Sequence, residues 1–145
     1  MTDARNRSLF LWLTLTLLLP IALFAGEEVA PADTKRPERL TLVDAAMCEK
    51  IEDGRLSNRA VVFSTTLGNV TCYTAFDPVP EKTDIYHEWY RKDSLASRMK
   101  LTLQPPRWSS VSTIQLREAD KGPWRVEIVD GRGNIFKTLR FSITD

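Results

Sequence analysis

Residues 95–103, which read Leu-Ala-Ser-Arg-Met-Lys-Leu-Thr-Leu, decide the fold class expected for this chain. Larger apolar residues occupy every second position or nearly so, while Arg98 and Lys100 fall on the positions between them. A period of two residues is the pattern of a β-strand with one buried face. We therefore expect a half-buried strand here, and the two prolines at 105–106 end it because proline cannot donate a backbone hydrogen bond.

The same rhythm of short strands and turns continues along the chain. Residues 124–130 and 135–143 both alternate, and residues 131–134 read as the hairpin turn that joins them. About seven or eight short strands with turn residues between them are typical of an all-β sandwich or barrel. Because the strands are short and the turns tight, we expect residues 40–145 to form one β-sandwich of the immunoglobulin or fibronectin type.

Local composition gives three further assignments. Residues 53–58 are expected to form a loop. Residues 60–67 are rich in β-branched and aromatic side chains, and the Gly-Asn pair at 68–69 leads into a similar run at 70–76, which predicts a hairpin. Residues 40–48 fit either a first strand or a short helix.

The start of the chain is typical of an export signal. Arg5 and Arg7 precede an apolar run over residues 9–25. The run is 17 residues long, which is the lower limit for a transmembrane helix, and Pro20 suits a cleaved signal better than a permanent anchor. We expect residues 1–25 to be a signal peptide, with an uncleaved N-terminal anchor in the inner membrane as the alternative. Both place the rest of the chain outside the cytoplasm, in the periplasm or beyond it.

Residues 26–39 are rich in Pro, Ala, Glu and Lys and are expected to form a flexible linker before the domain. The whole chain of 145 residues has 20 basic and 19 acidic side chains, and removing residues 1–25 leaves 18 of each. A neutral domain with interspersed charges lacks the electrostatic footprint of a nucleic-acid-binding protein. We expect no nucleic-acid partner, and membrane contact only through residues 9–25 where these are retained.

The two cysteines, Cys48 and Cys72, both lie in the part expected to be exported. In an oxidising compartment an even pair favours a disulfide, which would close a loop of about 24 residues. The alternative is two buried thiols that behave as small apolar side chains.

Residues with catalytic chemistry are few. His87 is the only histidine, and one histidine with two separated cysteines does not supply the three or four ligands of a zinc site. No serine lies in a nucleophile-elbow motif. We expect no catalytic residue, no metal and no cofactor, and an enzymatic alternative would have to depend on His87. The carboxylates that a glycosidase would need are expected to be solvated surface groups: Glu118, Asp120, Glu127 and Asp130.

Aromatic residues gather in the middle of the expected domain. Exposed rings stack on sugars or anchor a protein partner, whereas buried rings form core. Trp108 follows Pro105, Pro106 and Arg107 at a junction between loop and strand, so it is the best candidate for exposure. The candidate binding residues, with core packing as the alternative, are His87, Trp89, Tyr90, Trp108 and Trp124.

Three spaced motifs indicate a family. Residues 85–90 read Ile-Tyr-His-Glu-Trp-Tyr, residues 106–110 read Pro-Arg-Trp-Ser-Ser, and residues 122–127 read Gly-Pro-Trp-Arg-Val-Glu. In this order, over about residues 75–144, they resemble the DUF2914 family of uncharacterised bacterial proteins. The resemblance implies an exported or envelope protein with a β-rich domain, and it implies no known activity.

Two functional hypotheses follow. The first is a non-enzymatic interaction module of the bacterial cell envelope, which binds another envelope protein through sheet edges or through the loops at 77–84 and 104–108. The alternative is a carbohydrate-binding module that stacks a cell-surface polysaccharide on exposed aromatic rings.

Overall fold

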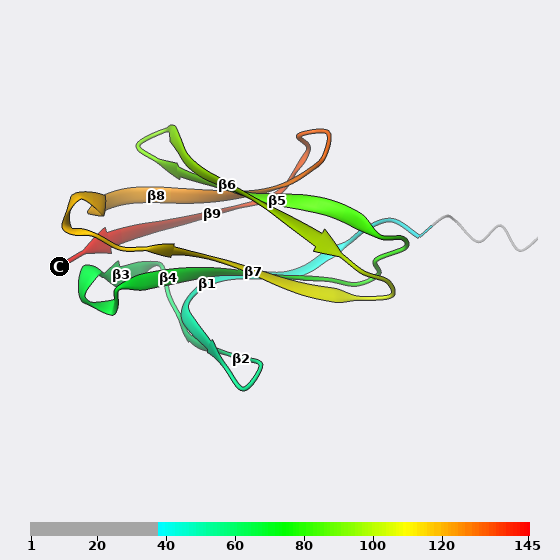
Figure 1. Ribbon diagram of the computed structural model, residues 1–145, viewed down its shortest axis with the longest axis horizontal. Coiled ribbons are helices and arrows are strands. Elements are labelled where there is room, and N and C mark those ends of the chain that lie inside the picture. The colour runs from blue at the N-terminus through cyan, green and yellow to red at the C-terminus, as the bar shows by residue number, and fades with distance from the viewer. Residues whose placement is uncertain (1–37) are drawn as a thin grey trace, which may run out of the picture. The chain divides into compact units, whose positions relative to one another are not determined.

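The computed structural model describes residues 38–145, and Figure 1 shows their arrangement. The expected leader at 1–25 and nearly all of the expected linker at 26–39 lie outside the described residues. The described part is all-β, with nine strands and two short 3-10 turns. None of its helical turns has the length and apolar character needed to cross a bilayer.

The nine strands form two sheets that lie one above the other (Figure 1). The four-stranded sheet has the order β2 (Arg55–Arg59), β1 (Leu42–Glu52), β4 (Asn69–Phe76), β7 (Trp108–Gln115). The five-stranded sheet has the order β3 (Val62–Ser64), β9 (Ile135–Thr144), β8 (Gly122–Asp130), β5 (Thr83–Arg91), β6 (Ser94–Leu103). Neighbouring strands run antiparallel except β3 and β9, which are parallel. The 3-10 turns are η1 (Thr65–Leu67) and η2 (Glu118–Asp120).

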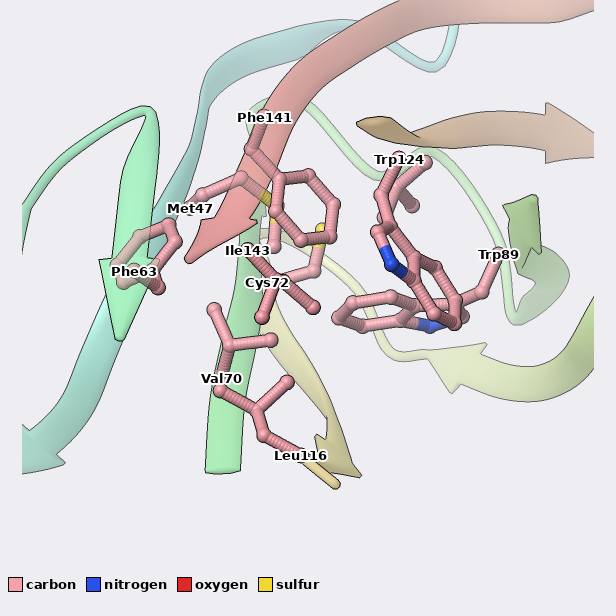
Figure 2. Close-up of a cluster of buried hydrophobic side chains, with 10 residues drawn as sticks. Met47, Phe63, Val70, Cys72, Trp89, Leu116, Trp124, Phe141 and Ile143 are labelled. Atoms are coloured by element: carbon pink, nitrogen blue, oxygen red, sulfur yellow. The ribbon is translucent and has the colours of Figure 1, made fainter. Parts of the chain in front are cut away.

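The core forms where the inward faces of the two sheets meet, and Figure 2 shows one of its two clusters. Phe141 is central in this cluster, because its ring stacks on Trp124 at 6.2 Å and meets the edges of Trp89 and Phe63 at 6.0 Å each. The second cluster includes Phe76, Ile85, Leu103 and Ile128. The alternation at 124–130 is confirmed, since Trp124, Val126 and Ile128 are all buried.

Not every inward assignment is confirmed. Leu95 and Ile135 stand at alternating positions but are 52% and 55% exposed. A register shift lies beside each residue, so Leu95 pairs with Tyr90 and Ile135 with Val129, and the alternation of the rest of the strand is interrupted there. Phe136, rather than Ile135, packs against the core, with its ring 5.3 Å from that of Phe76. Of residues 40–48, those from Leu42 onwards form a strand and none forms a helix, and β1 continues to Glu52.

Two local predictions are wrong. Residues 53–58, expected as a loop, contain most of β2, which pairs with β1 across a turn at Asp53 and Gly54. The expected hairpin across residues 68–69 does not form, because β3 pairs with β9 of the five-stranded sheet while β4 pairs with β1 and β7. Between them, Ser64 Oγ accepts a hydrogen bond from Thr66 N–H at 3.1 Å and Gly68 has φ +74°. This 3-10 turn carries the chain from one sheet to the other instead of back along the same sheet.

The predicted Cys48–Cys72 disulfide is also wrong, since both residues are free, buried thiols. The register of β1 and β4 pairs Met47 with Cys72 and Cys48 with Thr71. Because successive side chains point to opposite faces of a sheet, Cys72 joins the core while Cys48 lies on the outer face. Burial raises the pKa of both thiols, that of Cys72 to about 12. The alternative of two buried thiols is the one that the structure has.

Trp124 offers a direct test of this core. Its ring is 7% exposed, and its indole N–H donates a hydrogen bond to the Asp120 carbonyl at 2.7 Å. Trp124→Ala should lower the free energy of unfolding by about 3–5 kcal/mol, as emptying an aromatic core site usually does. Trp108→Ala, at a ring that is 43% exposed, is the control and should cost less than about 1 kcal/mol. Denaturant unfolding measures both, and equal losses would contradict this placement of the two rings.

Candidate functional site

The five candidate residues do not form one site. His87 and Trp89 are fully buried and Trp124 is 7% exposed, so all three belong to the core. Tyr90 lies on the outer face of the five-stranded sheet, where its hydroxyl donates to Glu88 at 2.9 Å and Arg125 covers its ring at 4.1 Å. Trp108 is 43% exposed at the first residue of β7. Only Trp108 combines an exposed indole with a surface hollow.

His87 links the two sheets through a chain of hydrogen bonds. From β5, its Nδ1 lies 2.8 Å from Ser112 Oγ on β7, and its Nε2 lies 3.2 Å from Thr74 Oγ1 on β4. The Trp89 indole N–H donates to the same Ser112 Oγ at 3.1 Å. The Thr74 hydroxyl in turn donates to the Ser110 carbonyl at 3.4 Å.

Counting donors assigns the hydrogens in this chain. Ser112 accepts from Trp89 and donates its hydroxyl hydrogen to His87 Nδ1. His87 Nε2–H then donates to Thr74, whose hydroxyl hydrogen goes to the Ser110 carbonyl. If Nδ1 carried the hydrogen instead, the Ser112 hydroxyl would have no acceptor among its contacts in the described residues. The imidazole is therefore neutral, with its hydrogen on Nε2.

Burial supports the same protonation state. It lowers the pKa of His87 from 6.5 to about 4, so the ring is uncharged at neutral pH. A serine beside a histidine nitrogen has the spacing of a nucleophile and its base. Here, however, His87 is fully buried and Ser112 is 4% exposed, so neither atom faces solvent. What this arrangement does is satisfy buried polar groups and tie β5 to the opposite sheet.

Ser112 and Thr74 were not among the residues that the sequence indicated. The sequence contains only a weak indication of them. Each is a polar residue in a strand, and the residues two positions away point to the buried side. Their partnership with His87 depends on contacts across the two sheets, which no local pattern carries.

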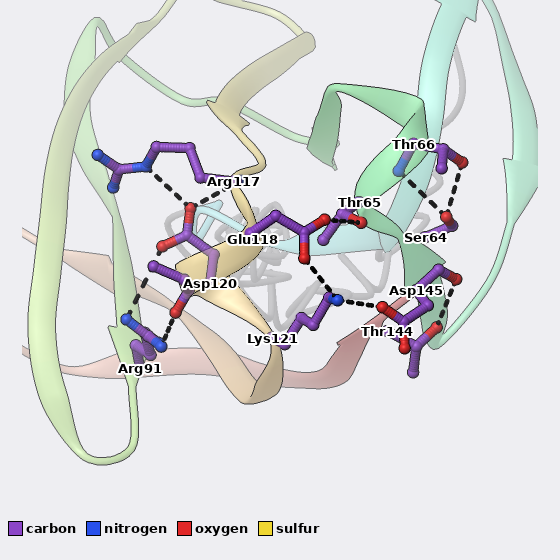
Figure 3. A network of polar contacts seen from close by, with 11 residues as sticks. Ser64, Thr65, Thr66, Arg91, Arg117, Glu118, Asp120, Lys121, Thr144 and Asp145 are labelled. Carbon is purple, nitrogen blue, oxygen red and sulfur yellow. Dashed lines mark hydrogen bonds and ion pairs between the residues drawn. The ribbon is translucent and has the colours of Figure 1, made fainter.

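Asp120 corrects another expectation, since this carboxylate is buried rather than solvated (Figure 3). Its Oδ2 accepts hydrogen bonds from the Arg117 backbone N–H at 2.9 Å and from Arg117 Nε at 3.1 Å. Arg91 Nη1 lies 3.9 Å from the other carboxylate oxygen, and Arg91 also donates to the Ala119 carbonyl. Together with the bond from Trp124 to its carbonyl, these contacts make Asp120 the anchor of the turn before β8.

Charge is distributed unevenly over the outer faces of the two sheets. On the four-stranded sheet, ion pairs are confined to β1 and β2, where Asp44 pairs with Arg59 and Lys50 with Glu52. On the five-stranded sheet, ion pairs of 2.8–2.9 Å cover the surface: Arg98–Glu88, Lys100–Asp84 and Arg125–Glu127. Strands β4 and β7 contain no Asp, Glu, Lys or Arg at all. Their outward side chains instead pair through neutral hydroxyls at 3.0 Å, Thr71 with Thr113 and Tyr73 with Ser109. We call this outer surface of β4 and β7 the β4–β7 face.

A hollow of about 450 Å³ adjoins the β4–β7 face, and we call it the Trp108 pocket. Two loops meet there, because the Val79 N–H of the β4–β5 loop donates to the Pro106 carbonyl of the β6–β7 loop at 2.7 Å. These are the two loops in which the sequence placed a binding site. The lining residues include Val43, Ala75, Asp77, Arg107, Trp108 and Ser109.

The Trp108 pocket combines several kinds of surface. Val43 is 58% exposed and provides apolar surface beside the Trp108 indole, while Arg107 and Asp77 add opposite charges and Ser109 a hydroxyl. Such a mixture of one large amphipathic ring with a few polar groups suits a protein side chain or a sugar. A larger hollow of about 510 Å³ lies beside Asp84, Asp130 and Arg132, but it holds no tryptophan.

The buried histidine makes stability depend on pH. The pKa of His87 is about 4 in the folded state and 6.5 ordinarily, so the unfolded chain binds the extra proton first as pH falls. The stability that a neutral His87 provides is complete above about pH 6.5 and is lost as pH falls towards 4. Between pH 7 and pH 5 the free energy of unfolding should drop by about 2 kcal/mol. Urea titrations at both values measure this, with His87→Gln, which lacks the titrating group, as the flat control; an equal drop in both proteins would contradict it.

Ser112 and Ser110 form a matched pair for testing the hydrogen-bond chain. Both face inward on β7, but only the Ser112 hydroxyl contacts His87 and Trp89. Ser112→Ala leaves two buried groups without partners and should lower the free energy of unfolding by about 2–4 kcal/mol. Ser110→Ala retains the carbonyl that Thr74 uses and should cost less than about 1 kcal/mol. Thermal or urea unfolding decides, and similar losses for both would refute the assigned role of Ser112.

The comparisons with known proteins agree with the motifs of the sequence. No curated protein matches the chain at a significant level. A family model described as "Protein of unknown function (DUF2914)" matches residues 82–143, which run from the start of β5 almost to the end of β9. The match includes His87, Trp108 and Trp124 but not Thr74, which β4 supplies. Residues 82–143 therefore match the DUF2914 family model, as the resemblance of the motifs at 85–90, 106–110 and 122–127 indicated.

Proposed function

We propose that residues 40–145 are a β-sandwich of the immunoglobulin or fibronectin type that serves as a non-enzymatic binding module of the bacterial cell envelope. In this proposal the Trp108 pocket holds a side chain of another envelope protein, and the β4–β7 face lies against that protein. One observation carries this proposal. Trp108 is the one exposed tryptophan of the described residues, and it lines a hollow where a backbone hydrogen bond joins two loops.

The placement of the other candidates supports a surface function. The polar ring atoms of three candidates all have hydrogen-bond partners within the protein, so these residues stabilise the fold. The three are His87, Trp89 and Trp124. Protein interfaces are depleted of charged residues at their centres and enriched in aromatic ones. The β4–β7 face has this composition, with Tyr73 and Val111 beside the Trp108 pocket and no ionised side chain on either strand.

Export belongs to the same proposal. Arg5, Arg7 and the apolar run at 9–25 would direct the chain across the inner membrane, either as a cleaved signal or as a retained anchor. Residues 26–39 would then act as a flexible tether that lets the domain reach its partner.

The alternative is a carbohydrate-binding module, and one specific observation favours it. The exposed face of Trp108 has Asp77, Arg107 and Ser109 beside it, and these could bond to sugar hydroxyls while the ring stacks on the sugar. Against it, Trp89 and Trp124 are buried, which leaves one indole where the sequence offered three for a stacking platform.

Crosslinking in intact cells tests the choice. A tagged full chain, its Trp108→Ala variant and a Leu95→Ala control would be crosslinked in parallel, and the captured material identified by mass spectrometry. Leu95 is a suitable control because it is also exposed but lies on β6. We expect one envelope protein with the wild type and the control, and at least about a tenfold loss with Trp108→Ala, as at an interface hot spot.

Other outcomes would count against the proposal. Capture of insoluble wall or polysaccharide alone, lost with Trp108→Ala, would support the carbohydrate alternative. Equal capture of the same protein by all three chains would exclude the Trp108 pocket as the binding site.

A further inference from the structure

Among residues 38–145, strand β7 ends the four-stranded sheet with an edge that pairs with no other strand. The Leu116 N–H that follows the strand donates to Gly68 O at 2.9 Å, so this residue turns its backbone groups towards β4. The register between β4 and β7 has no bulge, and backbone direction alternates along a strand. The residues that alternate with Leu116 therefore point their backbone N–H and C=O groups away from β4. They are Ser109, Val111, Thr113 and Gln115. The same residues have exposed side chains on the β4–β7 face.

The β7 edge lacks the features that protect other edges from pairing. Proteins block free edges with charged side chains, proline or very short strands. In this domain β2 has Arg55 and Arg59 and β6 has Arg98 and Lys100, while β3 has only three residues. Strand β7 has eight residues with no charge and no proline.

We propose that the β7 edge pairs with the β7 edge of a second copy of this chain. The two strands run antiparallel about a two-fold axis, which joins the four-stranded sheets of both copies into one sheet of eight strands. This inference concerns pairing along the backbone edge of β7 and not a side chain held in the Trp108 pocket, so it goes beyond the proposed function.

A strand without charged residues can pair with its own copy without repulsion, and the arginines that flank β7 decide between two registers. A two-fold axis at Ser112 would place Arg107 of each copy opposite Arg117 of the other, where like charges directly opposed destabilise a pair. With the axis at Val111, Arg107 lies opposite the neutral Gln115. Ser109 then faces Thr113, and the two Val111 side chains, each 45% exposed in the single chain, cover one another. An uncharged strand meets its own copy without repulsion at any position in this register.

Cysteine crosslinking tests the register in intact cells that express the full chain. Val111→Cys places two thiols across the proposed axis, and mild oxidation should convert most of the chain into a covalent dimer on a non-reducing gel. Leu95→Cys, equally exposed but on the edge of β6, should remain monomeric. Native Cys48 and Cys72 are both fully buried, so the wild-type chain gives the background level of crosslinking. Absence of the Val111→Cys dimer, or an equal yield from Leu95→Cys, would overturn the proposal.

Light scattering on the purified protein tests the association itself. We expect the mass of two chains at micromolar concentration, reduced to one chain by Val111→Lys or Thr113→Lys and unchanged by Leu95→Lys. A one-chain mass for the wild type at all concentrations up to hundreds of micromolar would refute the dimer. Val43→Ala, which alters the Trp108 pocket from β1 and lies outside β7, should leave the two-chain mass unchanged, so failure of the dimer and failure of the proposed function give different results.

Discussion

A neutral imidazole between two sheets is the constraint on which the rest of this structure depends. His87 connects β5 to β4 and β7 through Thr74 and Ser112, and Trp89 shares Ser112 with it. A buried histidine would be costly if either nitrogen lacked a partner or if the ring were charged. Every donor in the hydrogen-bond chain around His87 has an acceptor. These polar residues therefore leave no group of their own unsatisfied, and they specify how the two sheets face one another.

This constraint separates the core from the surface. With His87, Trp89 and Trp124 committed to packing, chemistry directed at a ligand is left to exposed residues. The outer surfaces are unequal in this respect. Solvated ion pairs cover the five-stranded sheet and strands β1 and β2, whereas the β4–β7 face has no charge to desolvate. The DUF2914 match begins after β4, so the region it describes contains His87 and Ser112 but needs Thr74 from outside it to complete the hydrogen-bond chain.

Local patterns in the sequence predicted the parts of the fold that local physics decides. Alternation identified strands β6, β8 and β9 and the inward side of Trp124, because a period of two depends only on neighbouring residues. The pairing of strands depends on distant segments, which explains why the hairpin at 68–69 and the disulfide were predicted wrongly. One residue of register between β1 and β4 puts Cys48 and Cys72 on opposite faces, and nothing near either cysteine signals it. Trp108 was singled out by its place after two prolines, whereas the pocket around it depends on a contact between loops far apart in sequence.

The most direct test of this account is the nitrogen spectrum of His87. Because the chain has one histidine, labelling histidine with ¹⁵N gives the two ring signals of this residue alone. We predict a neutral ring with its hydrogen on Nε2, unchanged from pH 8 down to about pH 5, because burial lowers the pKa of His87 to about 4. A hydrogen on Nδ1, or a ring that titrates near pH 6.5, would contradict the hydrogen-bond chain and return His87 to the candidates for a functional site.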